Sequence, residues 1–520
     1  MKSSQNSQLD TLNKDALLAS MAERIDQLEH QLDWFKRQLF GRKSEKQLLD
    51  NPLQKSLFGT PEVVQSAPAA QIEVKPHKRK SNTQRSGEEV NDTGLRFDDS
   101  VPKKVIDISL PELSGADADQ YEIIGYKDTT RLAQQPGSYV VLIYRRPVVR
   151  HQLKQTVGTV PAPSAVFDGC YADVSIIAGL MVDKAVYFLP LYRQHQRLLD
   201  SGITLSRATL INWMHQGIEL LRPIYQAQLQ HILLSTVLAM DEVPIKAGRK
   251  GKGKGKMKQT YFWPIYGEQG EVAFTWSPSR GMAHAKAQLE GFNGTLLTDG
   301  YAAYTRTVTQ LNEQDQQVIH ATCWAHTRRK FEQALKMEPE AAQRGLDFIA
   351  KLYVFEKHIK EHQLKADDAL AYRTSHSEPI IRDFFNWLHQ LRQNPELLPS
   401  NPLSKAIAYA QERETSLKVF LSNPNVPLDT NHLERALRVI PMGRKNHLFC
   451  WSELGAEQLG ILQSLMVTCR IQGINPYHYL VDVLQRVALH PASQVEDLTP
   501  LNWKTKFADN FLTSDLALMG

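Results

Sequence analysis

Three acidic residues stand where their side chains could share divalent metal ions. Asp241 and Asp299 each follow a short, largely apolar run directly, and Glu434 lies within residues 431–438, whose pattern is helical. Carboxylate oxygens are the ligands that Mg²⁺ and Mn²⁺ prefer, and a pair of such ions about 4 Å apart can hold both oxygens of an in-line phosphoryl displacement. A lone carboxylate is more often a surface charge or a helix cap. The prediction therefore rests on three carboxylates in this order on these elements. We expect them to be catalytic metal ligands that meet at one Mg²⁺ or Mn²⁺ position.

Glu242 is the carboxylate that competes with Asp241 for this role. Successive side chains along a strand point to opposite faces of the sheet. We therefore expect Glu242 to lie on the face that Asp241 does not use.

Residues 248–258 alternate glycine with positive charge. A phosphate-binding P-loop is excluded because the hydroxyl that should follow Lys254 is replaced by Gly255, and because the segment joins two hairpin strands. The prediction is a mobile loop that contacts the DNA backbone, and the alternative is a solvated turn. The cations concerned are Arg249, Lys250, Lys252, Lys254, Lys256 and Lys258.

Residues 320–326 contain three possible zinc ligands, His320, Cys323 and His326. Zinc sites usually take four ligands in two clustered pairs. Since no second pair is evident, zinc is not expected here.

Further cations flank the candidate carboxylates. Arg328 and Arg329 are predicted to contact phosphates, as are Arg444 and Lys445. Arg438 stands one helical turn after Glu434, so it is predicted either to serve the same site or to pair with carboxylates.

The chain that must position these residues has 520 residues and a net charge of +5, so it has room for several domains, and bulk charge does little to favour nucleic acid. No apolar stretch is long enough to span a membrane, and the first residues lack the apolar core of a signal peptide. The four cysteines form no CxxC pair, which is typical of a reducing cytoplasm. We expect a cytoplasmic protein.

The periodicities predict a multidomain α/β protein. Apolar residues from Leu18 to Leu39 alternate spacings of three and four, which favours a coiled coil over one helix packed on its own chain. The predicted parts are a coiled-coil helix at 9–46, a disordered basic linker at 47–104, a β-rich module at 105–169, a helical region at 170–232, an α/β catalytic core at 233–335 and 425–490, a helical insertion at 336–424 and a tail at 491–520.

Residues 189–213 read as helix, turn at Gly202 and second helix, with Ser206 as N-cap. This pattern is typical of a helix-turn-helix that reads DNA, and equally of an ordinary helical hairpin.

Nine short blocks together resemble the large transposases of the bacterial insertion-sequence sixty-six family. They run in family order along nearly the whole chain: KRQLFGRKSEK (36–46), LPLYR (189–193), MDEVP (240–244), DGYAAY (299–304), CWAHTRRKF (323–331), NHLERALR (431–438), GRKN (443–446), NPY (475–477) and LNWK (501–504).

The resemblance implies a ribonuclease-H-like transposase whose acidic triad maps onto Asp241, Asp299 and Glu434. It also implies a Cys-x-x-His element at Cys323 and His326, terminal inverted repeats and target DNA as substrates, and two small accessory proteins as partners. A homo-oligomer associated with the bacterial nucleoid is expected, since two DNA ends must meet. The family carries a cysteine-rich zinc module after its linker. Because residues 105–169 contain no cysteine, either this module folds without metal or DNA recognition is altered.

Two other functions compete with transposition. A catalytically idle DNA-binding protein would leave the intact triad without a purpose. A zinc-dependent hydrolase around His320 and His326 lacks a fourth ligand.

Overall fold

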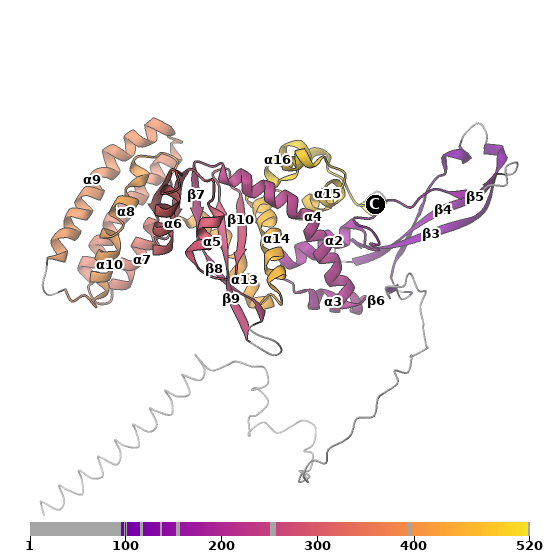
Figure 1. The fold of residues 1–520 in the computed structure, drawn as a ribbon, viewed down its shortest axis with the longest axis horizontal. Helices are drawn as coiled ribbons and strands as arrows, with labels where there is room; N and C mark the ends of the chain where they lie inside the picture. Colours follow the sequence, from indigo (N-terminus) through magenta and orange to yellow (C-terminus); the bar gives the residue numbers. More distant parts are fainter. Residues whose placement is uncertain are drawn as a thin grey trace, which may run out of the picture. The chain divides into compact units, whose positions relative to one another are not determined.

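The computed structural model describes residues 95–97, 99, 101–114, 118–135, 138–151, 157–249, 256–393 and 397–517. All of them belong to one unit, Arg85–Gly520. The predicted coiled coil at 9–46, most of the predicted linker, and Lys250, Lys252 and Lys254 lie outside the described residues. The described part is a multidomain mixture of helices and mixed sheets, as predicted (Figure 1).

A mixed sheet carries the first two candidate carboxylates. Its strand order is β10-β9-β7-β11-β12, and β8 pairs with β9 beside this path. Strands β7, β11 and β12 run parallel, whereas β9 pairs antiparallel with β7, β8 and β10. The strands are β7 (Val237–Met240), β8 (Val243–Arg249), β9 (Met257–Tyr266), β10 (Val272–Ser277), β11 (Gly294–Thr298) and β12 (Val318–Thr322).

Strand β8 was not predicted, because the apolar run was expected to end directly before Asp241 and residues 248–258 were expected to join it to the next strand. Proline is rare inside a sheet, yet β8, which contains Pro244, pairs with β9 on one side along most of its length. The basic loop therefore joins β8 to β9.

Different helices cover the two faces of this sheet. Leu238 and Met240 of β7 join a core cluster with residues of α5 (Met282–Gln288) and α6 (Ala302–Asn312). Ala239, between them in the sequence, joins a different cluster with Leu433 and Ala456. This second cluster includes residues of α12 (Asn431–Leu437), α13 (Val439–His447) and α14 (Glu453–Ile471). Strand alternation thus assigns each β7 residue to one helical layer.

A helical segment lies between β12 and α12 in the sequence. Its core is rich in aromatic residues, with Trp324, Phe331, Phe384 and Trp387 in contact. Its helices are α7 (Trp324–Ala334), α8 (Pro339–Glu361), α9 (Ala366–Arg392), α10 (Pro402–Gln411) and α11 (Glu414–Leu417), followed by the 3₁₀ turn η4 (Val419–Leu421).

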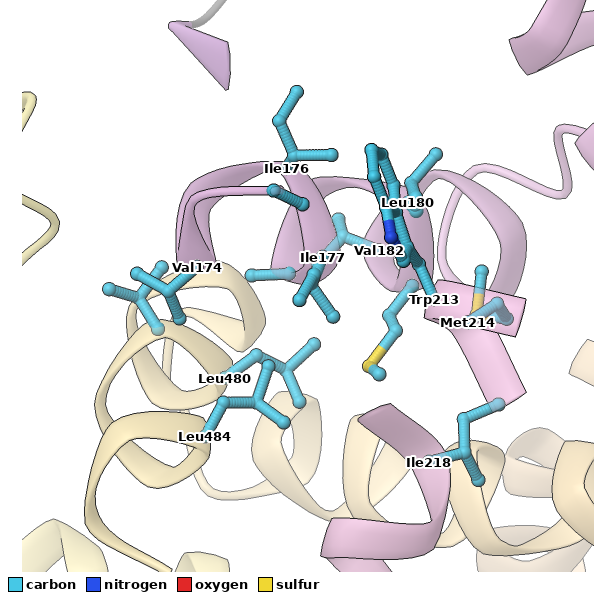
Figure 2. Packing of buried hydrophobic residues seen from close by; sticks show 14 of the residues in the cluster. Val174, Ile176, Ile177, Leu180, Val182, Trp213, Met214, Ile218, Leu480 and Leu484 are labelled. Carbon is cyan, nitrogen blue, oxygen red and sulfur yellow. The ribbon is translucent and has the colours of Figure 1, made fainter. Parts of the chain in front are cut away.

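Helices from both ends of the described chain share another core. Figure 2 shows Ile177 and Leu180 of α2, Trp213 and Met214 of α4, and Leu480 of α15 in one cluster. Contributing elements are α2 (Val174–Ala185), α3 (Leu191–Asp200), α4 (Arg207–Leu233), α14, α15 (Pro476–Arg486), η5 (Ala492–Leu498) and α16 (Pro500–Lys506), with η6 (Ala508–Asn510) following.

Local capping sets where two of these helices begin. The Asp173 side chain accepts from the Ser175 amide at the start of α2. The predicted N-cap is confirmed, since the Ser206 hydroxyl accepts from the Thr209 amide at the start of α4.

A long hairpin precedes the helices (Figure 1). Strand β4 pairs antiparallel with β3 and β5 and parallel with β2. Its elements are β2 (Lys103–Asp107), η2 (Pro111–Leu113), η3 (Ala118–Gln120), β3 (Tyr121–Gln135), β4 (Ser138–His151) and β5 (Val157–Thr159).

The last residues of the predicted linker are folded. Leu95 is fully buried, β1 (Arg96–Phe97) pairs with β6 (Ile203–Thr204), and β2 begins at Lys103. Composition assigned this stretch to the linker because its apolar residues are few, but they are packed against the helical core.

All four cysteines are free thiols. In the described part of the chain, no helix has both the length and the apolar character needed to cross a bilayer.

Candidate functional site

The sheet brings Asp241 and Asp299 next to each other. Strands β7 and β11 are parallel neighbours, with Val237 opposite Thr295 and Ala239 opposite Leu297. Continuing this register by two residues sets Asp241 opposite Asp299, where both strands end at the same edge of the sheet. The predicted strand-end positions of these two aspartates are confirmed.

Each aspartate is oriented by the backbone that follows it. Asp241 Oδ1 accepts from the Glu242 amide at 2.7 Å, and Asp299 Oδ1 accepts from the Tyr301 amide at 2.8 Å. Gly300, between Asp299 and Tyr301, has φ of +81°, a conformation that L side chains rarely adopt. The turn after β11 therefore needs glycine to direct the chain into α6.

Helix α12 presents Glu434 on the Ala239 side of the sheet, where Leu433 packs in the same cluster. Before the helix begins, the Thr430 amide and hydroxyl both donate to Cys323 Sγ at 3.3 Å. This thiol therefore links the end of β12 to the start of α12.

Two basic side chains, His326 and Arg329, face the Glu434 carboxylate. Its Oε1 lies 3.7 Å from both His326 Nε2 and Arg329 Nη2, which is beyond hydrogen-bond distance. Oε1 is buried and accepts no hydrogen bond from the described residues. Burial also lowers the pKa of His326. The histidine and glutamate of two separate motifs thus meet in one place.

Burial and nearby carboxylates raise the pKa of Asp241. Burial raises its pKa to about 7, and the carboxylates of Glu242, Asp299 and Glu434 add to this rise. Nearby like charges disfavour ionisation, and a divalent cation would relieve this repulsion. Carboxylate oxygens are the donors that Mg²⁺ and Mn²⁺ prefer, and Glu434 Oε1 accepts no hydrogen bond from the described residues.

No three His, Cys, Asp or Glu side chains within the described ranges lie close enough together to hold a metal ion. The convergence of Asp241, Asp299 and Glu434 on one metal position therefore stays a prediction.

Glu242 has other partners, on the opposite face. The Tyr304 hydroxyl donates to its Oε2 at 2.7 Å, and Arg280 donates to its Oε1. Tyr304 belongs to the core cluster that contains Met240. Strand alternation predicted this placement.

Two residues of the helical segment hold the turn after Asp299, and the sequence analysis missed both. The Tyr409 hydroxyl donates to the Asp299 carbonyl oxygen at 2.5 Å. Arg413 donates from Nε and Nη2 to the Gly300 carbonyl oxygen, at 3.2 and 3.0 Å, and its guanidinium lies over the Tyr409 ring. No local signal links them to a turn 110 residues earlier in the sequence.

The predicted nucleic-acid contacts have varied surroundings. The Arg249 guanidinium lies over the Trp451 ring, Lys258 pairs with Glu453 and Arg328 pairs with Glu332. Arg444 donates to the Pro244 carbonyl oxygen, which joins α13 to β8. Lys256 and Lys445 are exposed.

Arg438 is exposed and caps the end of α12 at Leu437. It therefore stands at a break between α12 and α13, and it does not continue the helix that carries Glu434.

Three relatives from Sinorhizobium fredii (strain NBRC 101917 / NGR234) are similar to this chain. The uncharacterized protein y4jD is 31% identical over 66% of this chain and 68% of its own length. The uncharacterized proteins y4qI and y4hP are 30% and 26% identical, over 74% and 92% of this chain and 72% and 88% of their own lengths.

Models of three protein families match successive parts of the sequence. Residues 27–90 match the one described as Transposase C of IS166 homeodomain, and residues 464–501 match the IS66 C-terminal element. Residues 169–458, which contain all three candidate carboxylates, match the Transposase IS66 family. The order of these matches follows the order of the motifs on which the resemblance was founded, and the chain belongs to the Transposase IS66 family.

Proposed function

We propose that this protein is a transposase that cuts the ends of an insertion sequence and joins them to target DNA, using Asp241, Asp299 and Glu434. The observation that carries the proposal is the register of β7 and β11, which puts two aspartates side by side beneath the helix that bears Glu434. Family membership supports the same reaction class.

The architecture supports a ribonuclease-H-like core. Three antiparallel strands, β7, β9 and β10, are followed by the parallel strands β11 and β12, and helices cover both faces. In such a core the helical segment from α7 to α11 is an insertion between the fifth strand and the helix that carries the glutamate.

In the proposed mechanism, Asp241, Asp299 and Glu434 hold the metal ions, while Tyr409 and Arg413 fix the turn that carries Asp299. Mg²⁺ held by these residues would supply charge stabilisation for the in-line displacement at a phosphodiester. Before metal binds, Arg329 balances part of the charge on Glu434, and His326 lies beside the same carboxylate oxygen. DNA is the substrate, and two copies of the chain bring two element ends together.

The test is cleavage of labelled duplexes that carry the terminal inverted repeats of the element. We expect strand cleavage with Mg²⁺ or Mn²⁺, and none with chelator. Asp299→Ala should abolish cleavage and leave binding to the ends largely intact. Glu290→Ala removes an exposed carboxylate at the end of α5 and serves as the control.

Two outcomes would contradict the proposal. Cleavage that survives Asp299→Ala would exclude this triad. End binding without cleavage in any divalent metal would identify a catalytically idle DNA-binding protein instead.

A further inference from the structure

A cavity of about 610 Å³ lies between the α3–α4 pair and the loop that joins α13 to α14. Its volume falls in the range of small-molecule sites, about 300–1,000 Å³. Five basic side chains line it, and they are Lys184, Arg193, Arg207, His215 and His447. No aspartate or glutamate is among the described residues that line it.

Burial affects two of these basic groups. Burial lowers the pKa of Lys184, and the thiol of Cys450 is the group that opposes this effect. His447 Nε2 is buried without a hydrogen-bond partner in the described part of the chain. Burial and the charge of Lys184 lower the pKa of His447 to about 4. A phosphate group in this cavity would give His447 Nε2 the hydrogen-bond partner that it lacks among the described residues.

Two exposed aromatic side chains, Tyr192 and Trp451, line the same cavity. Tyr192 is 59% exposed and Trp451 is 67% exposed, although large aromatic residues are usually well buried. The guanidinium of Arg207 lies 5.0 Å from the centre of the Tyr192 ring, and that of Arg249 lies 4.5 Å from the Trp451 ring. Flat rings with a nearby cation are surfaces on which nucleic-acid bases stack.

The loop that carries Trp451 is held in a strained shape. Leu448 has φ of +62°, a conformation that L side chains rarely adopt. The backbone of Cys450 is bonded to β8 on both sides, donating to Lys246 O at 2.8 Å and accepting from Gly248 N at 3.2 Å. The loop is thereby fixed to the strand that leads into the basic loop at 248–258.

We propose that this cavity binds one unstacked nucleotide of single-stranded DNA, with its base on Tyr192 or Trp451 and its phosphate against Lys184 and Arg207. The inference rests on the proposed function, because strand cleavage at a DNA end creates unpaired nucleotides. A lining that has five basic side chains, and no aspartate or glutamate among the described residues, favours a phosphate over an apolar protein segment.

The experiment compares a blunt duplex with the same duplex bearing a short single-stranded 3′ extension, by fluorescence anisotropy in chelator so that no cleavage occurs. The full-length protein should bind the extended duplex more tightly. Tyr192→Ala or Trp451→Ala should weaken binding of the extended duplex by about tenfold, the effect of losing one base–aromatic stack. Both should bind the blunt duplex as the unchanged protein does.

Tyr126→Ala is the matched control. Tyr126 is 60% exposed, and Arg145 lies 5.9 Å from its ring centre, but it stands on β3 outside the cavity. It should keep the full preference for the extended duplex. Arg207→Gln should lower the salt dependence on the extended duplex by about 0.7 per lost phosphate contact.

The possible failures are distinguishable. Equal affinity of the unchanged protein for both duplexes would overturn the nucleotide site but leave cleavage, and so the proposed function, untouched. A preference that survives both alanine variants would also overturn it. If these variants keep the preference but change the mass of the protein in solution, the cavity is a protein interface. Loss of binding to both duplexes by the unchanged protein would remove the proposed function as well.

Discussion

At the scale of single residues, the surroundings of the Asp241 carboxyl group disfavour its charged form. Burial and three neighbouring carboxylates raise its pKa to about 7, against about 3.9 in an unfolded chain. The folded protein therefore binds a proton more readily than the unfolded chain between these values. The stability that the protonated form contributes is present at low pH and is lost as pH rises through 7.

Asp241→Asn should therefore raise the melting temperature of the metal-free protein, because it removes a poorly solvated charge. In chelator, the gain should be larger at pH 8 than at pH 5, by roughly 1–3 kcal/mol. Mg²⁺ should stabilise the unchanged protein at pH 8 but stabilise this variant much less. Thermal melts at both pH values test this, and a variant that is less stable than the parent in chelator at pH 8 would show that the carboxylates do not repel one another.

At the scale of elements, the helical segment between β12 and α12 also holds the turn that follows Asp299. Tyr409 and Arg413 come from α10 and from the residues just before α11, and they hold the carbonyl groups of Asp299 and Gly300. Hydrogen bonds of this kind contribute about 0.5–1.5 kcal/mol each. In the proposed site, they would hold the turn that carries Asp299 in place for metal binding.

Tyr409→Phe should therefore raise the Mg²⁺ concentration needed for half-maximal cleavage several-fold, with little change in melting temperature. Tyr409 acts as a positioning residue, since its hydroxyl touches only the backbone of Asp299. Tyr372→Phe is the control, because its ring stacks between His358 and His376 on α8 and α9. An unchanged Mg²⁺ dependence in Tyr409→Phe would mean that the turn holds its shape without this bond.

The loop between β8 and β9 should bind the DNA backbone without reading sequence. Replacing Lys250, Lys252, Lys254 and Lys256 with serine should weaken binding to all duplexes alike. Each phosphate contact that is lost should reduce the slope of log affinity against log salt by about 0.9. Salt titrations with specific and unrelated duplexes measure both effects.

The control replaces four lysines on and just after α8 with glutamine. It removes the same number of positive charges from another part of the protein. The four positions are Lys351, Lys357, Lys360 and Lys365. If the loop variant and this control have the same affinity and slope, the loop cations are simply solvated.

At the scale of the whole molecule, the sequence predicts self-association through residues 9–46. Deleting residues 1–46 should reduce the mass of the protein measured in solution by light scattering, because the apolar seam from Leu18 to Leu39 is lost. The deleted protein should keep the fold of the described unit, which circular dichroism checks. An unchanged mass would mean that the helix packs only within its own chain.

The sequence by itself determined which residues could do chemistry and which elements carry them. Short apolar runs ending in Asp241 and Asp299 fixed two strand ends, and Ser206 fixed the start of α4. These are local signals, because strand alternation and capping depend on neighbours only a few residues away.

Only the tertiary structure decided which distant groups meet. The pairing of β7 with β11 set Asp241 beside Asp299, and packing brought Arg329 and His326 to Glu434. Tyr409 reached the Asp299 turn, and Trp451 reached Arg249, by the same means. Such contacts depend on how whole elements pack, and the residues involved are separated by up to about two hundred positions, a distance over which local sequence patterns carry no information.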